Sequence, residues 1–373
     1  MLQLLLGGSG SGKTTLLYQR IRARAEKGEK SILLVPEQFT SSTEGRIYRE
    51  LGDALSGMVE SFSFTSLAEK ILSTEGGAAV QTLSDAGRAV LVRRALEELQ
   101  DNVHYYHRHR RSAAFCQMAA QTIDELKSAG LSGQQLAQLA GACGAESGKL
   151  SELALIFQGY ETLLARSGMD PSDRLELAGA RLEEALARHS LPEFLRDRAV
   201  FIDEFDTFNA PKKRLLGALL EALPSVTVAL CDDGAPLLPG DLSLFSGAKQ
   251  VAAQLRQLAR KNGAEVAVPQ LLRKDLRHRN APGLAAVAEL LETGSCTADA
   301  PADEVRLFAA PSREEEARAA AGAIRRLMRQ GVRCGKIAVV CRDIAKYRAA
   351  VRYEFRMAEI PLYCDEPTTP EFS

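Results

Sequence analysis

Leu2-Gln-Leu-Leu-Leu-Gly7-Gly-Ser-Gly-Ser-Gly12-Lys13-Thr14 joins an apolar run to a glycine-rich turn that ends in a lysine. Leu2–Leu6 is typical of a buried parallel strand. The turn fits the pattern G-x-x-x-x-G-K-[ST], and Thr15 to Ala25 has the apolar spacing and the residue types of a helix. The order strand, glycine loop, helix predicts an α/β fold with a parallel sheet, in which the loop follows the first strand.

The glycine loop also predicts a nucleotide-phosphate site, although a chance glycine-rich turn is the alternative. Glycines let successive backbone N–H groups surround phosphate oxygens, and the helix N-terminus adds partial positive charge. Lys13 can reach the β- and γ-phosphates, and the Thr14 hydroxyl can ligate Mg²⁺. We therefore expect ATP and Mg²⁺ as ligands. The predicted phosphate-site residues are Gly7, Gly8, Ser9, Gly10, Ser11, Gly12, Lys13, Thr14 and Thr15.

A second buried-strand run, Arg198–Ile202, ends in Asp203-Glu204. A metal-bound triphosphate needs a carboxylate near the glycine loop, and a strand end supplies one in this position. We expect Asp203 to hold Mg²⁺ together with Thr14, and Glu204 to act as the catalytic residue that activates the attacking water. The alternative is an acidic strand end that closes a loop.

The 373 residues are enough for two or three domains. Between 84 and 190 the apolar residues recur at three- and four-residue steps, with breaks at Gly130 and Gly168–Pro171, which predicts a helical insertion. Residues 1–83 and 191–292 then form one split P-loop domain around a parallel sheet.

A linker rich in Gly, Thr, Ala and Pro, from Thr293 to Ala302, predicts a domain boundary. Beyond it, Val305–Ala309, Lys336–Val340 and Ile360–Tyr363 have the composition of strands. We expect residues 303–373 to be the truncated beginning of a second α/β domain.

Composition excludes several classes of protein. Lys and Arg (47) nearly balance Asp and Glu (48), so a nucleic-acid partner would have to bind a local patch. None of the seven cysteines forms a C-x-x-C pair, which argues against a zinc site, an iron–sulfur site or a disulfide framework. No apolar run approaches the roughly 20 residues of a membrane span, and no basic leader precedes the first strand. We expect a cytoplasmic protein with no membrane partner.

Several further segments resemble known families. Ile202-Asp-Glu-Phe-Asp-Thr207 is similar to the D-E-x-Q-D segment of UvrD-like superfamily 1 helicases, and Leu272–Arg277 is similar to their N-Y-R element. V-P-E-Q-F-T (35–40), S-F-S-F-T-S-L-A (61–68), I-D-E-L-K-S-A-G (123–130) and I-A-V-V-C-R-D (337–343) resemble, in order and spacing, the N-terminal half of AddB subunits of AddAB-type helicase–nucleases. The resemblance covers essentially the whole chain.

This resemblance implies a RecA-like motor fold, with Arg277 facing the γ-phosphate. It also implies a role in processing DNA double-strand breaks for recombinational repair, as a heterodimer with an AddA-type helicase–nuclease subunit. The family's nuclease domain and its iron–sulfur cluster would lie beyond Ser373. The positions that match the family's contacts to single-stranded DNA, including the Chi signal, are Gln38, Thr40, Phe64, Ser66, Phe205 and Phe208.

The chain also departs from the motor pattern. There is no room before Gly7 for the glutamine motif that reads adenine, and Ala229–Gly234 lacks the glutamine that couples the γ-phosphate to DNA. We therefore expect a pseudo-helicase that binds ATP without translocating. An active superfamily 1 translocase, with Arg277 or Arg342 as its γ-phosphate arginine, and a P-loop small-molecule kinase stay open as alternatives.

His104-Tyr-Tyr-His-Arg-His-Arg-Arg111 is the most basic and aromatic run of the chain. Such a run can hold phosphates and stack bases, or it can be a solvated loop between helices.

Overall fold

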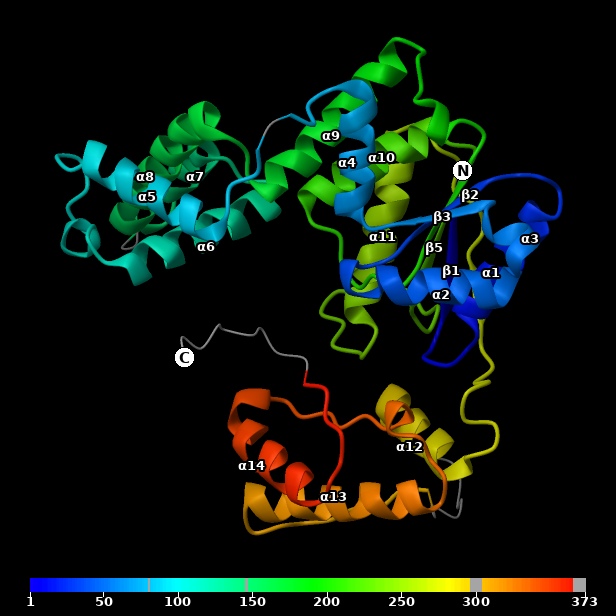
Figure 1. Cartoon of the computed structure of the whole chain (residues 1–373). Helices are drawn as coiled ribbons and strands as arrows, with labels where there is room; N and C mark the ends of the chain where they lie inside the picture. The colour runs from blue at the N-terminus through cyan, green and yellow to red at the C-terminus, as the bar shows by residue number, and fades with distance from the viewer. Residues whose placement is uncertain (80, 145–146, 296–303, 365–373) are drawn as a thin grey trace. The chain divides into compact units, whose positions relative to one another are not determined.

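The structure is a computed structural model that describes residues 1–79, 81–144, 147–295 and 304–364. It divides into two compact units, Met1–Ala298 and Asp299–Ser373, which we call the sheet unit and the C-terminal unit (Figure 1). The division falls inside the predicted linker, most of which (296–302) lies outside the described residues. Each unit has a hydrophobic core of its own.

The sheet unit contains a six-stranded sheet in the order β3-β2-β4-β5-β1-β6, and all of its strand pairs are parallel. The α/β fold built on a parallel sheet is therefore confirmed. β6 was not predicted, because three partly buried residues give too short a pattern to recognise. The strands are β1 Leu2–Gly7, β2 Ser31–Leu34, β3 Val59–Phe62, β4 Ala199–Ile202, β5 Ser225–Cys231 and β6 Gln270–Leu272.

Helices cover both faces of this sheet, which explains why its central strands are apolar on both sides. On one face, Leu4, Ile202 and Val228 contribute to a core shared with α4, α9, α10 and α11. On the other face, Leu5 and Phe201 pack against α1 and α2. The covering helices are α1 Lys13–Ala25, α2 Thr40–Leu51, α4 Phe64–Glu75, α9 Pro171–Ala187, α10 Ala210–Ala222 and α11 Ser246–Lys261.

The helical insertion has a core of its own, made by four helices that we call the helical module. Val92, Phe157 and Tyr160 are among its fully buried side chains. The predicted breaks are present, since one helix ends at Ser128 just before Gly130, and α9 begins at Pro171. The module consists of α5 Asp85–Glu98, α6 Ala113–Ser128, α7 Gly133–Ala140 and α8 Ser147–Ser167.

The last predicted helix of the insertion, α9, belongs by its packing to the sheet. Leu175, Ala178 and Leu182 enter the core on the sheet's face, where α9 lies against α4 and α10 (Figure 1). The side of α9 that faces the sheet is apolar at helical spacing, so this burial follows from the sequence. The predicted insertion of 84–190 therefore contains one helix that covers the sheet.

A buried polar contact lies where the helical module joins α9. Asp170, which is 1% exposed, accepts a hydrogen bond from the Tyr160 hydroxyl at 2.6 Å and one from Lys127 Nζ at 2.9 Å. Lys127 also pairs with Asp173 at 2.6 Å. Both of these partners of the buried carboxylate come from the helical module, while Asp170 itself precedes the first turn of α9.

The remaining helices of the sheet unit are short or lie near its end. α12 begins at Pro282, a residue suited to the first turn of a helix, and was not predicted. These elements are α3 Asp53–Ser56, α12 Pro282–Thr293 and the 3₁₀ turns Glu37–Phe39, His107–His109 and Glu193–Leu195.

The described residues of the C-terminal unit form helices and no strand. α13 spans Arg313–Arg329, α14 spans Ile344–Met357, and Cys334–Lys336 is a 3₁₀ turn. The predicted strands at Val305–Ala309, Lys336–Val340 and Ile360–Tyr363 are wrong for this structure. Strand-forming side chains are present, but a strand needs a neighbour for its N–H and C=O groups. The described part of this unit supplies none.

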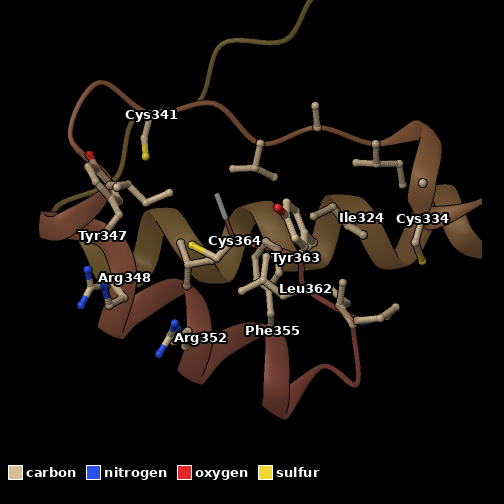
Figure 2. Close-up of a pocket in the computed structure, with 18 residues that line it drawn as sticks. Ile324, Cys334, Cys341, Tyr347, Arg348, Arg352, Phe355, Leu362, Tyr363 and Cys364 are labelled. Carbon is tan, nitrogen blue, oxygen red and sulfur yellow. The ribbon is translucent and has the colours of Figure 1, made fainter. Parts of the chain in front are cut away.

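An apolar cavity of about 660 Å³ lies between these helices and the extended segments. Figure 2 shows Phe355, Leu362 and Tyr363 gathered at its centre, with Ile324 of α13 behind them. No aspartate or glutamate lines this cavity among the described residues. It therefore lacks the carboxylates that acid–base or metal chemistry commonly uses, whereas the sheet unit places such groups beside a cavity at the glycine loop.

Candidate nucleotide site

The glycine loop Gly7–Gly12 runs from the end of β1 to the first residue of α1. Gly10 (φ 79°) and Gly12 (φ 90°) have left-handed backbone, which residues with a side chain adopt only at a cost. A Cβ at Gly10 would lie 2.6 Å from Cβ of Arg277, so both the backbone and the space require glycine there. The loop thus folds tightly and presents the N-terminus of α1.

Two side chains of the loop have their polar atoms in unusual surroundings. Lys13 Nζ donates hydrogen bonds to the carbonyl oxygens of Gly7 (2.8 Å) and Gly8 (2.9 Å), and burial lowers the pKa of Lys13. Ser11 is 6% exposed, and its hydroxyl has no hydrogen-bond partner among the described residues. A buried polar atom without a partner is unfavourable. An anion in the loop would supply acceptors for both groups.

Asp203 lies beside this loop, although it is far away in the sequence. It follows β4 directly, is 6% exposed, and its backbone N–H donates to the carbonyl of Leu34 at 3.1 Å. Thr14 lines the same cavity as Asp203. Burial raises the pKa of Asp203, and the nearby Thr14 hydroxyl opposes this rise. The structure therefore brings together the two side chains predicted to hold Mg²⁺.

Glu204 occupies a turn immediately after Asp203. Its φ of 65° is left-handed, and its N–H donates to Asp203 Oδ1 at 3.0 Å. Loss of solvent and the adjacent Asp203 raise the pKa of Glu204. A non-glycine residue in this backbone region carries strain that is typical of functional positions. Glu204 lines the same cavity as Thr14 and Asp203.

This cavity has a volume of about 530 Å³ and collects most of the predicted nucleotide-site residues. Gly7, Gly8 and Ser11 belong to the loop that borders it. A second cavity of about 510 Å³ shares Thr14, Asp203 and Glu204 with the first. The predicted residues that line the first cavity are Ser9, Gly10, Gly12, Lys13, Thr14, Thr15, Asp203, Glu204, Phe205 and Arg277.

Arg277 approaches the loop from the segment after β6. Its guanidinium donates from Nη1 to Ser9 Oγ at 3.0 Å, and the N–H of Leu276 donates to the carbonyl of Gly10 at 3.0 Å. The carboxylate of Asp275 accepts the N–H of Arg277 at 2.9 Å. The structure thus places Arg277 at the predicted site, on a segment that is hydrogen-bonded to the glycine loop.

Arg46 of α2 is a site residue that the sequence reasoning missed. Its Cζ lies 4.9 Å from the centre of the Tyr18 ring, and Arg46 lines both cavities. Its positive charge opposes the raised pKa values of Asp203 and Glu204. Arg46 belongs to the charged run Glu44–Glu50, which has the pattern of an ordinary solvated helix face. Arg46 lies between Thr43 and Ile47, which are both buried. This position is the one feature that could have indicated that Arg46 faces the site and not the solvent.

The residues predicted to contact DNA divide into two groups. Gln38 is exposed, the Thr40 hydroxyl donates to the carbonyl of Glu37 at 3.0 Å, and Ser66 exchanges hydrogen bonds with Ser63 in the capping box of α4. A hydrogen bond of 2.9 Å from Thr65 to Glu37 joins the segments that follow β2 and β3. These polar residues therefore lie on neighbouring segments at one end of the sheet.

The three aromatic rings of that prediction are buried. Phe64, Phe205 and Phe208 are 0%, 7% and 4% exposed, and their ring centroids lie 5.2 to 6.0 Å apart. Phe64 continues the apolar stripe of α4 into the sheet's core, and the other two rings pack against it. In this structure they are core residues, and a base could stack on them only if this packing opened.

Within the described ranges, no cluster of three or more His, Cys, Asp and Glu side chains could hold a metal ion. Thr14 and Asp203 supply one hydroxyl and one carboxylate, and Mg²⁺ in nucleotide sites commonly takes its other ligands from phosphate oxygens and water. No helix in the described part of the chain is long and apolar enough to cross a membrane.

Comparison with known proteins shows the family to which this chain belongs. Residues 4–288 match the family model described as ADDB, N-terminal. The chain belongs to the AddB family. This confirms the resemblance to AddB subunits.

The AddB relatives are named as the B subunits of an ATP-dependent helicase/deoxyribonuclease. The protein from Desulforudis audaxviator is 34% identical and that from Symbiobacterium thermophilum is 32% identical, over 98% and 99% of this chain. The protein from Geobacillus kaustophilus is 31% identical over 98% of this chain. The match covers 32% of each relative, so the chain spans about a third of their length.

Proposed function

We propose that this chain is the ATP-binding N-terminal part of an AddB-type subunit, which works with an AddA-type subunit in processing DNA double-strand breaks for recombinational repair. In this proposal the sheet unit is a RecA-like P-loop domain that holds ATP and Mg²⁺ but does not drive translocation. Membership of the AddB family supports the role in DNA processing. The contacts around the glycine loop support the nucleotide site.

The placement of Thr14 and Asp203 at the wall of one cavity carries the nucleotide proposal. It sets a hydroxyl and a carboxylate, the two side-chain ligands expected for Mg²⁺, at the wall of the cavity that Lys13 also lines. A second observation also fits a triphosphate. The buried Ser11 hydroxyl has no partner among the described residues, and a phosphate oxygen would supply an acceptor for it. A glycine turn formed by chance would require neither feature.

Each residue has a role in this site. The backbone N–H groups of the glycine loop and the Lys13 ammonium would bind the phosphates, while Thr14 and Asp203 would hold Mg²⁺. Arg277 and Arg46 both line the cavity, so both can neutralise phosphate charge. Bound ATP would supply a phosphoanhydride linkage, and the residues around it would orient it and screen its charge.

An active motor is the second candidate, and Glu204 favours it. Glu204 lines the cavity beside Asp203, and its pKa is raised. A raised pKa suits a general base, because a base acts best when its pKa is near the operating pH. Replacing Glu204 by Gln distinguishes the two functions. A DNA-stimulated ATPase activity that Glu204→Gln abolishes would support the motor, and ATP binding without turnover supports the pseudo-helicase.

For DNA contact we propose the polar residues of the two linked segments, Gln38, Thr40 and Ser66. Their hydroxyl and amide groups can bond to base edges, and the bond from Thr65 to Glu37 holds the segments together. Reading of the Chi signal, the AddA-type partner, the iron–sulfur cluster and a cytoplasmic location stay predictions.

Titration with Mg–ATP tests the proposal. We expect the parent chain to bind, and Lys13→Ala to weaken binding by at least about tenfold, because it removes a charge-assisted contact to phosphate. Lys27→Ala is the matched control, since Lys27 is an exposed lysine just after α1. Equal affinities of the parent and Lys13→Ala, or no binding by the parent, would refute a nucleotide site at the glycine loop.

A further inference from the structure

A segment of the helical module between α5 and α6 concentrates positive charge. His104–Arg111, which we call the basic loop, contains Arg108, Arg110 and Arg111 together with three histidines. Arg108 and Arg111 are exposed and Arg110 is half-buried. None of the three arginines forms an ion pair with a residue of the described ranges. Most other arginines of the module are paired, for example Arg93 with Glu97.

A carboxylate of α8 holds the backbone of the basic loop in place. The Glu152 carboxylate of α8 accepts hydrogen bonds from the N–H groups of His104 (2.9 Å), Tyr105 (2.8 Å) and Tyr106 (3.2 Å). Val103, which precedes the loop, is 2% exposed in the module's core. The loop is therefore an ordered platform, and its acidic neighbour is already engaged by backbone donors.

The basic loop also contains aromatic rings. Tyr106 packs on Phe115 with ring centroids 5.3 Å apart, and His109 packs on the same ring at 5.6 Å. Tyr105 is different, because 58% of its surface is exposed. Lys149 Nζ lies 5.2 Å from the centre of the Tyr105 ring, which adds a fourth cation to the platform.

We propose that the basic loop is a binding surface for single-stranded nucleic acid, separate from the nucleotide cavity and from the segments after β2 and β3. The arginines supply charge for successive phosphates, and Tyr105 supplies a ring on which a base can stack. A solvated loop with no ligand would not require unpaired arginines and an exposed tyrosine on a fixed backbone. This surface depends neither on ATP binding nor on the proposed partner subunit.

The test measures binding of a fluorescent oligothymidylate to the parent chain over a salt series. The basic-loop variant replaces Arg108, Arg110 and Arg111 by Ala. The matched control replaces Arg93, Arg94 and Arg181 by Ala, since these arginines are already paired with Glu97, Glu98 and Glu184. Both variants lose the same net charge.

We expect the basic-loop variant to bind at least about tenfold more weakly near 100 mM salt, and its slope of log K against log salt to be shallower by about 2, because each lost contact to a single strand removes about 0.7. The control should keep the parent's slope. Tyr105→Ala should weaken binding by about fivefold or more, whereas Tyr105→Phe, which keeps the ring, should bind as the parent does.

Three results would overturn the proposal: no binding by the parent, equal slopes for the two arginine variants, or competition by polyglutamate as effective as that by oligothymidylate at equal charge. The last result would identify an acidic protein surface as the ligand. Thermal unfolding of every variant checks that the helical module is intact. Because no arm contains ATP, failure here is distinct from failure of the ATP site.

Discussion

Thr14 and Asp203 line the same cavity, so the first turn of α1 and the end of β4 meet at one site. The whole helical module lies between these two residues in the sequence, and yet the parallel sheet brings both to the same edge. Because Asp203 is buried there, its charge is unfavourable for folding in the absence of a cation. This conflict leads to the first prediction.

Asp203→Asn should raise the thermal stability of the nucleotide-free protein near neutral pH and weaken Mg²⁺-dependent ATP binding by at least about tenfold. The folded-state pKa of Asp203 lies above its usual value of 3.8, so the folded protein binds this proton more tightly than the unfolded chain does. Stability therefore rises as pH falls through the raised pKa, and the variant's advantage should shrink as pH approaches about 4.

Asp206→Asn is the control for this experiment. Asp206 lines the same cavity but is exposed, so removing its charge should leave the unfolding temperature and its pH dependence close to those of the parent. If Asp203→Asn unfolds at the same temperature as Asp206→Asn at every pH, the buried charge does not oppose folding and this account of Asp203 is wrong.

The second prediction concerns Arg46. Arg46→Ala should weaken Mg–ATP binding by about tenfold, because a charge-assisted hydrogen bond to phosphate contributes about 1.5–3 kcal/mol. Arg46→Lys should restore part of the affinity by keeping the charge without the planar guanidinium. Isothermal titration of the three proteins measures the effect.

Arg49→Ala serves as the comparison for Arg46. Arg49 lies on the same helix and lines only the second cavity, so its loss should change ATP affinity little. Equal losses for Arg46→Ala and Arg49→Ala would mean that α2 acts through its overall charge and that Arg46 makes no particular contact with the nucleotide.

The third prediction separates backbone strain from crowding at the glycine loop. Gly10 (φ 79°) and Gly28 (φ 78°) have nearly the same backbone, but only a Cβ at Gly10 meets neighbours, at 2.6 Å from Cβ of Arg277. Gly28→Ala should therefore lower the free energy of unfolding by about 1–2 kcal/mol without affecting ATP binding. Gly10→Ala should cost more and weaken ATP binding at least about tenfold, since Arg277 must move.

Urea unfolding and ATP titration of both alanine variants provide the measurements. An unchanged ATP affinity for Gly10→Ala would show that the segment carrying Arg277 yields without cost, and that its contact with the loop is not part of the nucleotide site.

The glycine loop and Asp203 could be predicted from the sequence because their geometry is local. The spacing of Gly7, Gly12 and Lys13 is set by the turn itself, and a buried strand followed by an acid fixes where Asp203 emerges. Arg46 could not be predicted in this way. A charged residue on a helix has the same pattern whether it faces water or a cavity, and only the packing of α2 on the sheet distinguishes them.

The side-chain burial and the strand pairing that the sequence did not reveal have a common physical origin. Phe64 lies in a segment that matches a DNA-contact motif, but the sequence does not state whether its ring faces solvent or the core, and here the sheet's core includes it. The strand predicted at Lys336–Val340 is wrong for a related reason, because strand-forming residues are present there but pairing depends on a neighbour elsewhere in the chain. The burial of a side chain and the pairing of a strand are both set by tertiary contacts.

The last prediction concerns the buried contact between the helical module and α9. Tyr160→Phe should lower the free energy of unfolding by about 1–2 kcal/mol, because it removes one hydrogen bond to Asp170. Lys127→Met should cost about 3–5 kcal/mol, since it leaves the Asp170 carboxylate buried without its cation. Urea unfolding measures both, and Arg93→Ala, in an exposed pair with Glu97, should change stability by less than about 1 kcal/mol.

The double variant Lys127→Met/Asp170→Asn decides whether the charge of Asp170 causes the large loss. With both charges removed, an amide at position 170 can still accept the Tyr160 hydroxyl, so the double variant should be more stable than Lys127→Met alone. If the two losses simply add, Lys127 stabilises the protein through its other contacts, to Asp173 at 2.6 Å and to the Tyr160 ring at 6.0 Å, and the ion pair with Asp170 is not what joins the module to α9.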